Sequence, residues 1–144
     1  MNKVSFEAYL NKYHCLTYRI DGMSMWPLLK PGRDTFTVRV VERHEFCRKW
    51  DVVLYKRLLD IYVLHRIIRI HEDSYDILGD NCTGIERHIP KENIIGVMTE
   101  FTHKNKIYKV NDRRYGMYVA LWCKPYKIRI WLKRWFNAAL NKKE

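Results

Sequence analysis

Short runs of β-branched and aromatic residues alternate with polar turn sequences through most of the chain. The longest run, Ile61–Ile70, is interrupted only by His65-Arg66 and Arg69, which is typical of a strand. Many short strands separated by turn signals favour a small coiled sheet or barrel over βαβ repeats, so we expect a mainly β fold. The expected strands cover residues 17–20, 35–41, 51–55, 61–70, 74–78, 94–101 and 106–110.

Helical periodicity is confined to the two ends of the chain. Apolar residues recur at roughly helical spacing over residues 3–13, which predicts a short amphipathic helix. The sequence becomes helical again from Tyr115, and Pro125 should separate a short element from a longer helix. We therefore expect a β-rich domain over 1–111 and a helical C-terminal extension over 112–144. Apolar residues of the longer helix follow i, i+3, i+4, i+7, i+8 spacing: Ile128, Trp131, Leu132, Trp135, Phe136, Ala139 and Leu140.

Positive charge is concentrated in this extension. Nine Lys or Arg and two acidic residues lie between Asp112 and Glu144, so the segment carries +7 of the net charge of +11. Basic, aromatic-rich amphipathic helices lie in bilayer interfaces, which makes an anionic membrane surface a candidate partner through Lys127–Lys143. The alternative is a helix packed on its own domain with solvated charges. Nucleic acid is disfavoured as a partner, because the aromatic residues follow a helical stripe and not a strand platform.

Four widely spaced cysteines, with no CxxC pair, indicate reduced thiols. Charged residues interrupt every apolar run of Met1–Tyr18, so this segment resembles neither a secretory signal nor a membrane span. No other segment reaches the roughly 18 uninterrupted apolar residues that a span requires. We expect a cytoplasmic protein that is soluble or peripheral at the inner membrane face.

The segment Asp21–Asp34 is the first candidate for chemistry. Pro27 and Pro31 exclude a regular helix, and the flanking glycines permit unusual backbone shapes. Ser24 lies between two methionines at this bend. A small hydroxyl at a rigid bend with large apolar neighbours would suit an exposed nucleophile, whereas the alternative is a turn with a buried methionine pair.

A serine nucleophile needs a base, and His65 stands out among the six histidines because it lies in the middle of an apolar strand. A polar ring there must find a partner or line a site. On periodicity alone, His65 is a core histidine with a satisfied hydrogen bond.

The other histidines are expected to be solvated, since His71, His88 and His103 fall in turns. A metal site built from His88, Cys82 and Asp80 is disfavoured, because their spacing fits no zinc template. No metal or other cofactor is expected.

Three short sequence blocks follow one another along the chain. The first is Gly22–Leu29 with Gly32 and Asp34, and the second is Asp51–Tyr55 running to Tyr62–Ile68. The third is Ile77–Asn81, followed by Glu86-Arg87, Ile89-Pro90 and Ile94–Gly96. Together they resemble three regions of the signal peptidase I and LexA-type superfamily of serine proteases. The first block resembles the nucleophile box, G-x-S-M-x-P-x-L…G-D, and the second resembles the paired strands that carry the general base. The third resembles the stretch G-D-N…D-(S)-R…V-P…I-(I/V)-G. The resemblance covers about residues 20–98 and implies that family's coiled catalytic β-domain.

The resemblance implies that Ser24 is the nucleophile and that backbone N–H groups of the turn at Gly22 and Met23 help to form the oxyanion hole. Most bacterial members have a lysine base at the position of His65. This chain is therefore similar to the Ser–His branch, which includes the endoplasmic-reticulum and sporulation-type signal peptidases. An imidazole can act as a base without the dehydrated pocket that a lysine needs.

An imidazole base usually needs a carboxylate to hold its tautomer. Glu86 and Asp80 are the two candidates. Glu86 matches the later acidic residue of the family, although the family has Asp there, and Asp80 either completes a triad or holds the shape of its loop. Met25 and Trp26 are expected to border a shallow apolar substrate groove.

Two departures narrow the expected substrate. Arg33 interrupts the family's adjacent Gly-Asp pair, and this sequence shows no membrane anchor before the nucleophile box. We therefore expect an endopeptidase that cleaves a precursor peptide or regulatory protein, and not secretory signal peptides. The alternative is a non-catalytic module that captures an extended peptide by β-augmentation, but such a module needs neither Ser24 nor His65.

Overall fold

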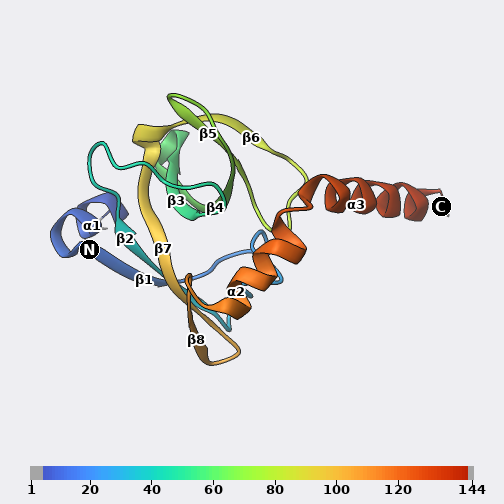
Figure 1. The fold of residues 1–144 in the computed structure, drawn as a ribbon, viewed down its shortest axis with the longest axis horizontal. Helices are drawn as coiled ribbons and strands as arrows, with labels where there is room; N and C mark the ends of the chain where they lie inside the picture. The colour runs from blue at the N-terminus through green and yellow to red at the C-terminus, as the bar shows by residue number, and fades with distance from the viewer. Residues whose placement is uncertain (1–4, 143–144) are drawn as a thin grey trace.

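Eight antiparallel strands form one open, strongly curved sheet, which confirms a mainly β fold with short helices towards both ends of the chain (Figure 1). This computed structural model describes residues 5–142, so residues 3 and 4 of the expected first helix, and Lys143, lie outside the described residues. The helices are α1 (Phe6–Tyr13), α2 (Arg113–Tyr118) and α3 (Tyr126–Asn141), with 3-10 turns at Leu58–Asp60 and Lys91–Asn93 and a π-helical turn at Val119–Cys123. The strands are β1 (Cys15–Arg19), β2 (Thr35–Val40), β3 (Val52–Arg57), β4 (Ile61–Ile70), β5 (Ser74–Leu78), β6 (Glu86–Pro90), β7 (Ile94–His103) and β8 (Lys106–Lys109).

The strand order is β1-β2-β7-β3-β4-β5-β6, and β8 pairs with β7. Strand β3 lies in the middle and is buried on both faces. Val52 and Leu54 belong to one apolar core, which also contains residues of α1, α2 and the segment Asp21–Asp34, here called the serine segment. Val53 and Tyr55 alternate with them and belong to a second core with β5. This central strand supports its neighbour β4, in which His65 pairs with Val53.

Strand β6 was not expected from the sequence. Its residues are mostly charged or polar and end in Pro90, and they form the last strand of the sheet, where a proline costs no ladder hydrogen bond. His88 therefore lies in a strand, which corrects its placement in a turn. The connection between β3 and β4 is shorter than expected. Strand β3 continues past its expected end at residue 55 to Arg57, and a 3-10 turn then connects it to β4.

The first part of the C-terminal extension packs into the core of the sheet, and its last helix extends away from the domain. Tyr115, Val119 and Cys123 are buried in the first core, whereas α3 projects from the body and buries Ile130 (Figure 1). Six apolar side chains of α3 are between 50% and 63% exposed, so the expected apolar stripe exists but is not packed on the domain. Within residues 5–142, no helix has the length and apolar character to cross a bilayer. The exposed side chains are Ile128, Trp131, Leu132, Trp135, Phe136 and Leu140.

Candidate active site

A groove of about 510 Å³ lies where the serine segment meets the curved sheet, and both Ser24 and His65 line it. Ser24 is half-buried on the segment that follows β1, and His65 is 7% exposed in the middle of β4. The fold thus brings together the two residues that the sequence marked as nucleophile and base. Apolar walls come from α1, the residue after β1 and the strands β2, β3 and β4: Phe6, Ile20, Phe36, Leu54, Tyr62, Val63 and Leu64.

Gly79 marks the point where the two residues converge. A Cβ placed on Gly79 would lie 2.8 Å from the Ser24 carbonyl oxygen and 2.9 Å from Nε2 of His65. The same atom would lie 2.6 Å from Sγ of Cys82. Nε2 of His65 and the Ser24 carbonyl oxygen therefore both lie close to Gly79, and a side chain at position 79 would collide with both.

The other ring nitrogen of His65 faces two oxygen atoms. Nδ1 lies 3.4 Å from the Tyr55 hydroxyl and 4.0 Å from Oε1 of Glu86. Burial raises the pKa of Tyr55 to about 12, so this hydroxyl stays protonated at neutral pH and its oxygen can accept. The Glu86 carboxylate can only accept, so it favours the tautomer with its proton on Nδ1, which leaves Nε2 unprotonated.

His65 is neutral at physiological pH. Burial, and then the positive charge of Arg57, lower its pKa to about 4, against a smaller opposite influence of Asp80. A neutral imidazole can accept a proton from a serine hydroxyl, whereas an imidazolium cannot. The site therefore holds its candidate base in the active protonation state.

Hydrogen bonds from Asn81, in the loop after β5, stabilise the turn at Gly22–Ser24, here called the serine turn. The Asn81 N–H donates to the Ser24 carbonyl at 2.9 Å, and its side-chain amide donates to the Met23 carbonyl at 3.0 Å. Within residues 5–142, the N–H groups of Gly22, Met23 and Ser24 donate to no protein acceptor. These N–H groups are the ones that the resemblance names as oxyanion donors, and that role stays a prediction.

The two candidate carboxylates have separate environments. Glu86 lies beside Nδ1 of His65 and is itself bound by Arg57, whose Nε donates to Oε2 at 3.1 Å. Asp80 is buried and forms a two-bond pair with Arg66, with both N–O distances 2.8 Å, and it accepts from Tyr118 at 2.7 Å. Of the two, Glu86 is the carboxylate in reach of the imidazole, and Asp80 anchors its loop to the core.

The expected substrate groove needs a correction. Met25 is fully buried in the first core because its side chain anchors the serine segment, so it does not line the groove. Trp26 is 42% exposed but lines a neighbouring apolar groove, where its ring lies 6.5 Å from that of Trp122. The groove beside Ser24 is instead bordered by α1 and the strands β1, β2, β3 and β4.

Sequence reasoning missed the roles of Tyr55, Arg57 and Asn81. Tyr55 looked like one more apolar strand residue, and Arg57 lay in an expected turn. For Asn81 a signal existed, because Gly79-Asp80-Asn81 is a compact polar turn directly after a buried strand.

Replacing Gly79 with alanine is expected to lower turnover about 100-fold or more, because the added methyl group must displace His65 or the serine turn. The matched control is Gly84→Ala in the same loop, since a Cβ there meets no atom within 4 Å. Steady-state kinetics of the two variants, with circular dichroism to verify folding, make the comparison. Equal turnover in both would contradict the convergence at Gly79.

The chain matches no protein-family model and no curated protein.

Proposed function

We propose that this protein is a serine endopeptidase on a coiled sheet of the signal peptidase and LexA type, with Ser24 as nucleophile and His65 as general base. The observation that supports it most is the convergence of Nε2 of His65 and the main chain of Ser24 on Gly79, inside a groove that both residues line. A nucleophile and its base must line one groove and lie close together, and these two residues do both.

The geometry suits an acyl-enzyme mechanism. Oγ of Ser24 attacks the substrate carbonyl carbon as its proton passes to Nε2 of His65. The N–H groups of the Gly22–Ser24 turn stabilise the oxyanion. Collapse breaks the C–N bond, and the imidazolium returns its proton to the leaving amine. A water molecule, deprotonated by His65, then attacks the ester carbonyl. The C–Oγ bond breaks, and the imidazolium returns its proton to Oγ of Ser24. Glu86 stabilises the imidazolium through Nδ1.

The lining of the groove indicates its substrate class. The groove offers apolar contacts from Ile20, Phe36 and Val63. Its charged lining groups are Arg19, Asp21 and Arg57. The adjacent β1 is an edge strand, paired only with β2 among the described strands. An extended peptide with small or apolar side chains near the cleaved bond fits this site.

Covalent labelling tests the proposal without a known substrate. A fluorophosphonate probe should modify folded protein on Ser24, as located by mass spectrometry, and Ser24→Ala should abolish the adduct. Ser5→Ala is the control, because Ser5 is an exposed hydroxyl that caps α1. Folded protein that resists the probe would favour the non-catalytic peptide-binding module.

The pH dependence of the reaction follows from the low pKa of His65. The acid limb of kcat/KM should lie near pH 4, because the base must be neutral, and an unperturbed imidazole would place it near 6.5. Arg57→Gln removes a positive charge and should move this limb upwards. Folding stability should also fall as pH drops from about 6.5 towards 4, since the unfolded chain then binds the proton first. A limb near 6.5 in the unmodified protein would contradict the neutral, buried base.

We also propose that α3 binds an anionic membrane surface. Its exposed apolar side chains continue into a second groove of about 590 Å³ that contains Trp26, close to Ser24 in the chain. Arg129 and Lys133 are turned instead to the loop after β5, where they donate to the carbonyls of Cys82 and Asn81. Lys124, just before α3, and Lys127, in its first turn, are exposed and supply positive charge for lipid headgroups.

The double variant Trp135→Gln/Phe136→Gln is expected to bind vesicles of phosphatidylglycerol and phosphatidylcholine at least about tenfold more weakly at physiological salt. Full burial of one such side chain contributes about 1.5–3 kcal/mol, and tenfold corresponds to about 1.4 kcal/mol. Leu58→Gln/Ile107→Gln removes two apolar side chains elsewhere that are even more exposed, and it is the control. Equal sedimentation of both variants with vesicles would exclude α3 as the membrane-binding element.

A further inference from the structure

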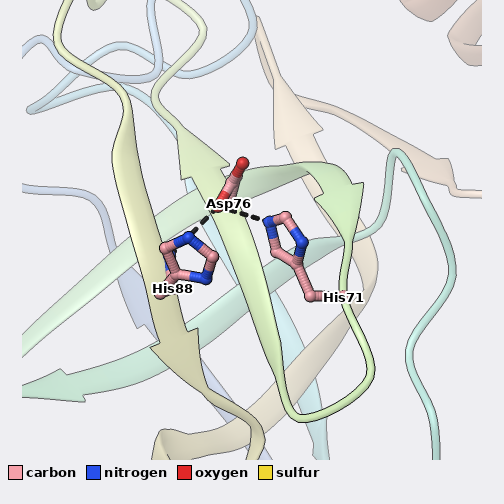
Figure 2. Close-up of side chains that lie close together, drawn as sticks. All are labelled: His71, Asp76 and His88. Atoms are coloured by element: carbon pink, nitrogen blue, oxygen red, sulfur yellow. Dashed lines mark hydrogen bonds and ion pairs between the residues drawn. The ribbon is translucent and has the colours of Figure 1, made fainter.

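A second cluster of reactive side chains lies on strands β4 to β6, apart from the groove. It consists of His71, which follows β4, Asp76 of β5 and His88 of β6 (Figure 2). One potential ligand atom from each residue lies within 4.8 Å of those of the other two. Two imidazoles and a carboxylate on three adjacent elements form a typical donor set for a transition metal.

The carboxylate is the buried member of the cluster. The side chain of Asp76 is 3% exposed and accepts a hydrogen bond from Nε2 of His71 at 2.9 Å and from the His88 N–H at 3.0 Å. Burial opposes its ionisation, but these bonds hold the pKa of Asp76 below its ordinary value. Arg87, on an exposed side chain, is 3.5 Å from the other carboxylate oxygen. Asp76 is therefore an ionised group whose nearest side-chain neighbour is an imidazole.

The backbone departs from regular pairing at this point. The register of β4 with β5 shifts between Ile67 and Arg69, and that of β5 with β6 shifts between Tyr75 and Ile77. His88 has a left-handed backbone with φ 55°, which a residue with a Cβ adopts at a cost. Such bulges redirect side chains, often at functional sites. Here they bring the ring of His88 to 4.5 Å from that of His71, centroid to centroid.

A supporting partner for one imidazole is also present. The Ser74 hydroxyl lies 3.3 Å from Nδ1 of His88. Ligating histidines usually engage one ring nitrogen in such an outer hydrogen bond, which fixes the tautomer and orients the other nitrogen. Nε2 of His88 is thus available as a ligand atom.

We propose that His71, Asp76 and His88 bind one divalent transition-metal ion, with Zn²⁺ the best match to two imidazoles and one carboxylate. Mg²⁺ and Ca²⁺ prefer all-oxygen sites and should not compete. Three protein ligands leave one tetrahedral position for water. The ion would join the turn after β4 to β6, the strand that also carries Glu86, and would stabilise this edge of the sheet.

Titration calorimetry of the tag-free full chain tests the site. We expect saturable binding of one equivalent of Zn²⁺, no detectable Mg²⁺ binding, and a Zn²⁺-dependent rise in the melting temperature that a chelator reverses. His88→Asn should weaken Zn²⁺ binding at least about tenfold, as the loss of an imidazole ligand requires. His44→Asn is the matched control, because His44 is exposed and has a similar left-handed φ of 73°, so it should bind as the unmodified protein does.

Co²⁺ substitution identifies the ligands independently of affinity. The visible d–d bands should appear without a thiolate charge-transfer band and should disappear in folded His88→Asn. Absence of Zn²⁺ binding, unchanged affinity in His88→Asn, or a thiolate band that assigns the ion to a cysteine would each overturn the proposal.

Discussion

Replacing Ser24 with alanine is expected to lower turnover by on the order of 10⁴–10⁶-fold, and His65→Ala should cost nearly as much. The first variant lacks the nucleophile, and the second lacks the only imidazole that lines the groove among the described residues. Because the two side chains act as one unit, the double variant should be scarcely worse than either single one. The measurement is single-turnover cleavage of a peptide selected from a library by the unmodified protein.

His44→Ala is the control for this comparison, since it removes an exposed imidazole that does not line the groove. It should keep turnover within about twofold of the unmodified protein, as expected of a surface substitution. Unchanged cleavage in folded Ser24→Ala or His65→Ala would refute the assigned roles. Strictly additive losses in the double variant would show that the two residues do not act together.

Replacing Asp80 with alanine is expected to destabilise the fold by about 3–5 kcal/mol. Arg66 is almost completely buried, and Asp80 neutralises its guanidinium through two hydrogen bonds of 2.8 Å. The remaining donors of Arg66 reach the carbonyl of Trp50 and the Tyr115 hydroxyl, which carry no compensating negative charge. The variant would leave a buried, unpaired cation. Urea unfolding measures the free energy directly.

Glu45→Ala is the matched control, because Glu45 also forms a two-bond pair with an arginine, Arg39, but at the surface. That pair should contribute no more than about 1 kcal/mol. Similar losses in both variants would contradict the assignment of Asp80 to the core. A shifted acid limb of kcat/KM in Asp80→Ala, without a loss of stability, would return Asp80 to the list of candidate catalytic groups.

Sequence patterns predicted the strands that have strong apolar character. The strand Ile61–Ile70 was predicted with its observed bounds because ten residues of mostly β-branched and aliphatic type leave little competition. Strand β6 escaped prediction because Glu86–Pro90 carries charges, a histidine and a proline. It is a strand because β5 offers a free edge, which is a tertiary cause that no local pattern contains.

The residue types of the candidate site were predictable from the sequence, but the directions in which their side chains point were not. Ser24 and His65 stood out through their contexts, yet spacing alone left Asp80 and Glu86 equivalent. The difference arises because the turn after β5 directs Asp80 to Arg66, whereas β6 carries Glu86 back beside β4. The misplacement of Met25 has a similar cause, since the serine segment needed an apolar anchor and the sequence does not reveal which methionine provides it.

The pattern of α3 predicted an apolar stripe without indicating what covers it. The orientation of α3 depends on two long basic side chains. Arg129 and Lys133 donate hydrogen bonds to the loop after β5 and so attach the helix to the domain through polar contacts. The apolar side chains therefore stay exposed. Lys133 also contacts Asn81, the residue that holds the Ser24 turn, so the extension is connected to the proposed active site.

The most direct test of the proposed chemistry is a crystal structure of the protein after reaction with a phosphonate probe. We predict a bond from Oγ of Ser24 to phosphorus, the phosphonyl oxygen within hydrogen-bond distance of the N–H groups of the Gly22–Ser24 turn, and Nε2 of His65 about 2.6–3.2 Å from Oγ. A probe attached to another residue, or an imidazole of His65 turned away from Ser24, would contradict the assignment of this pair as nucleophile and base.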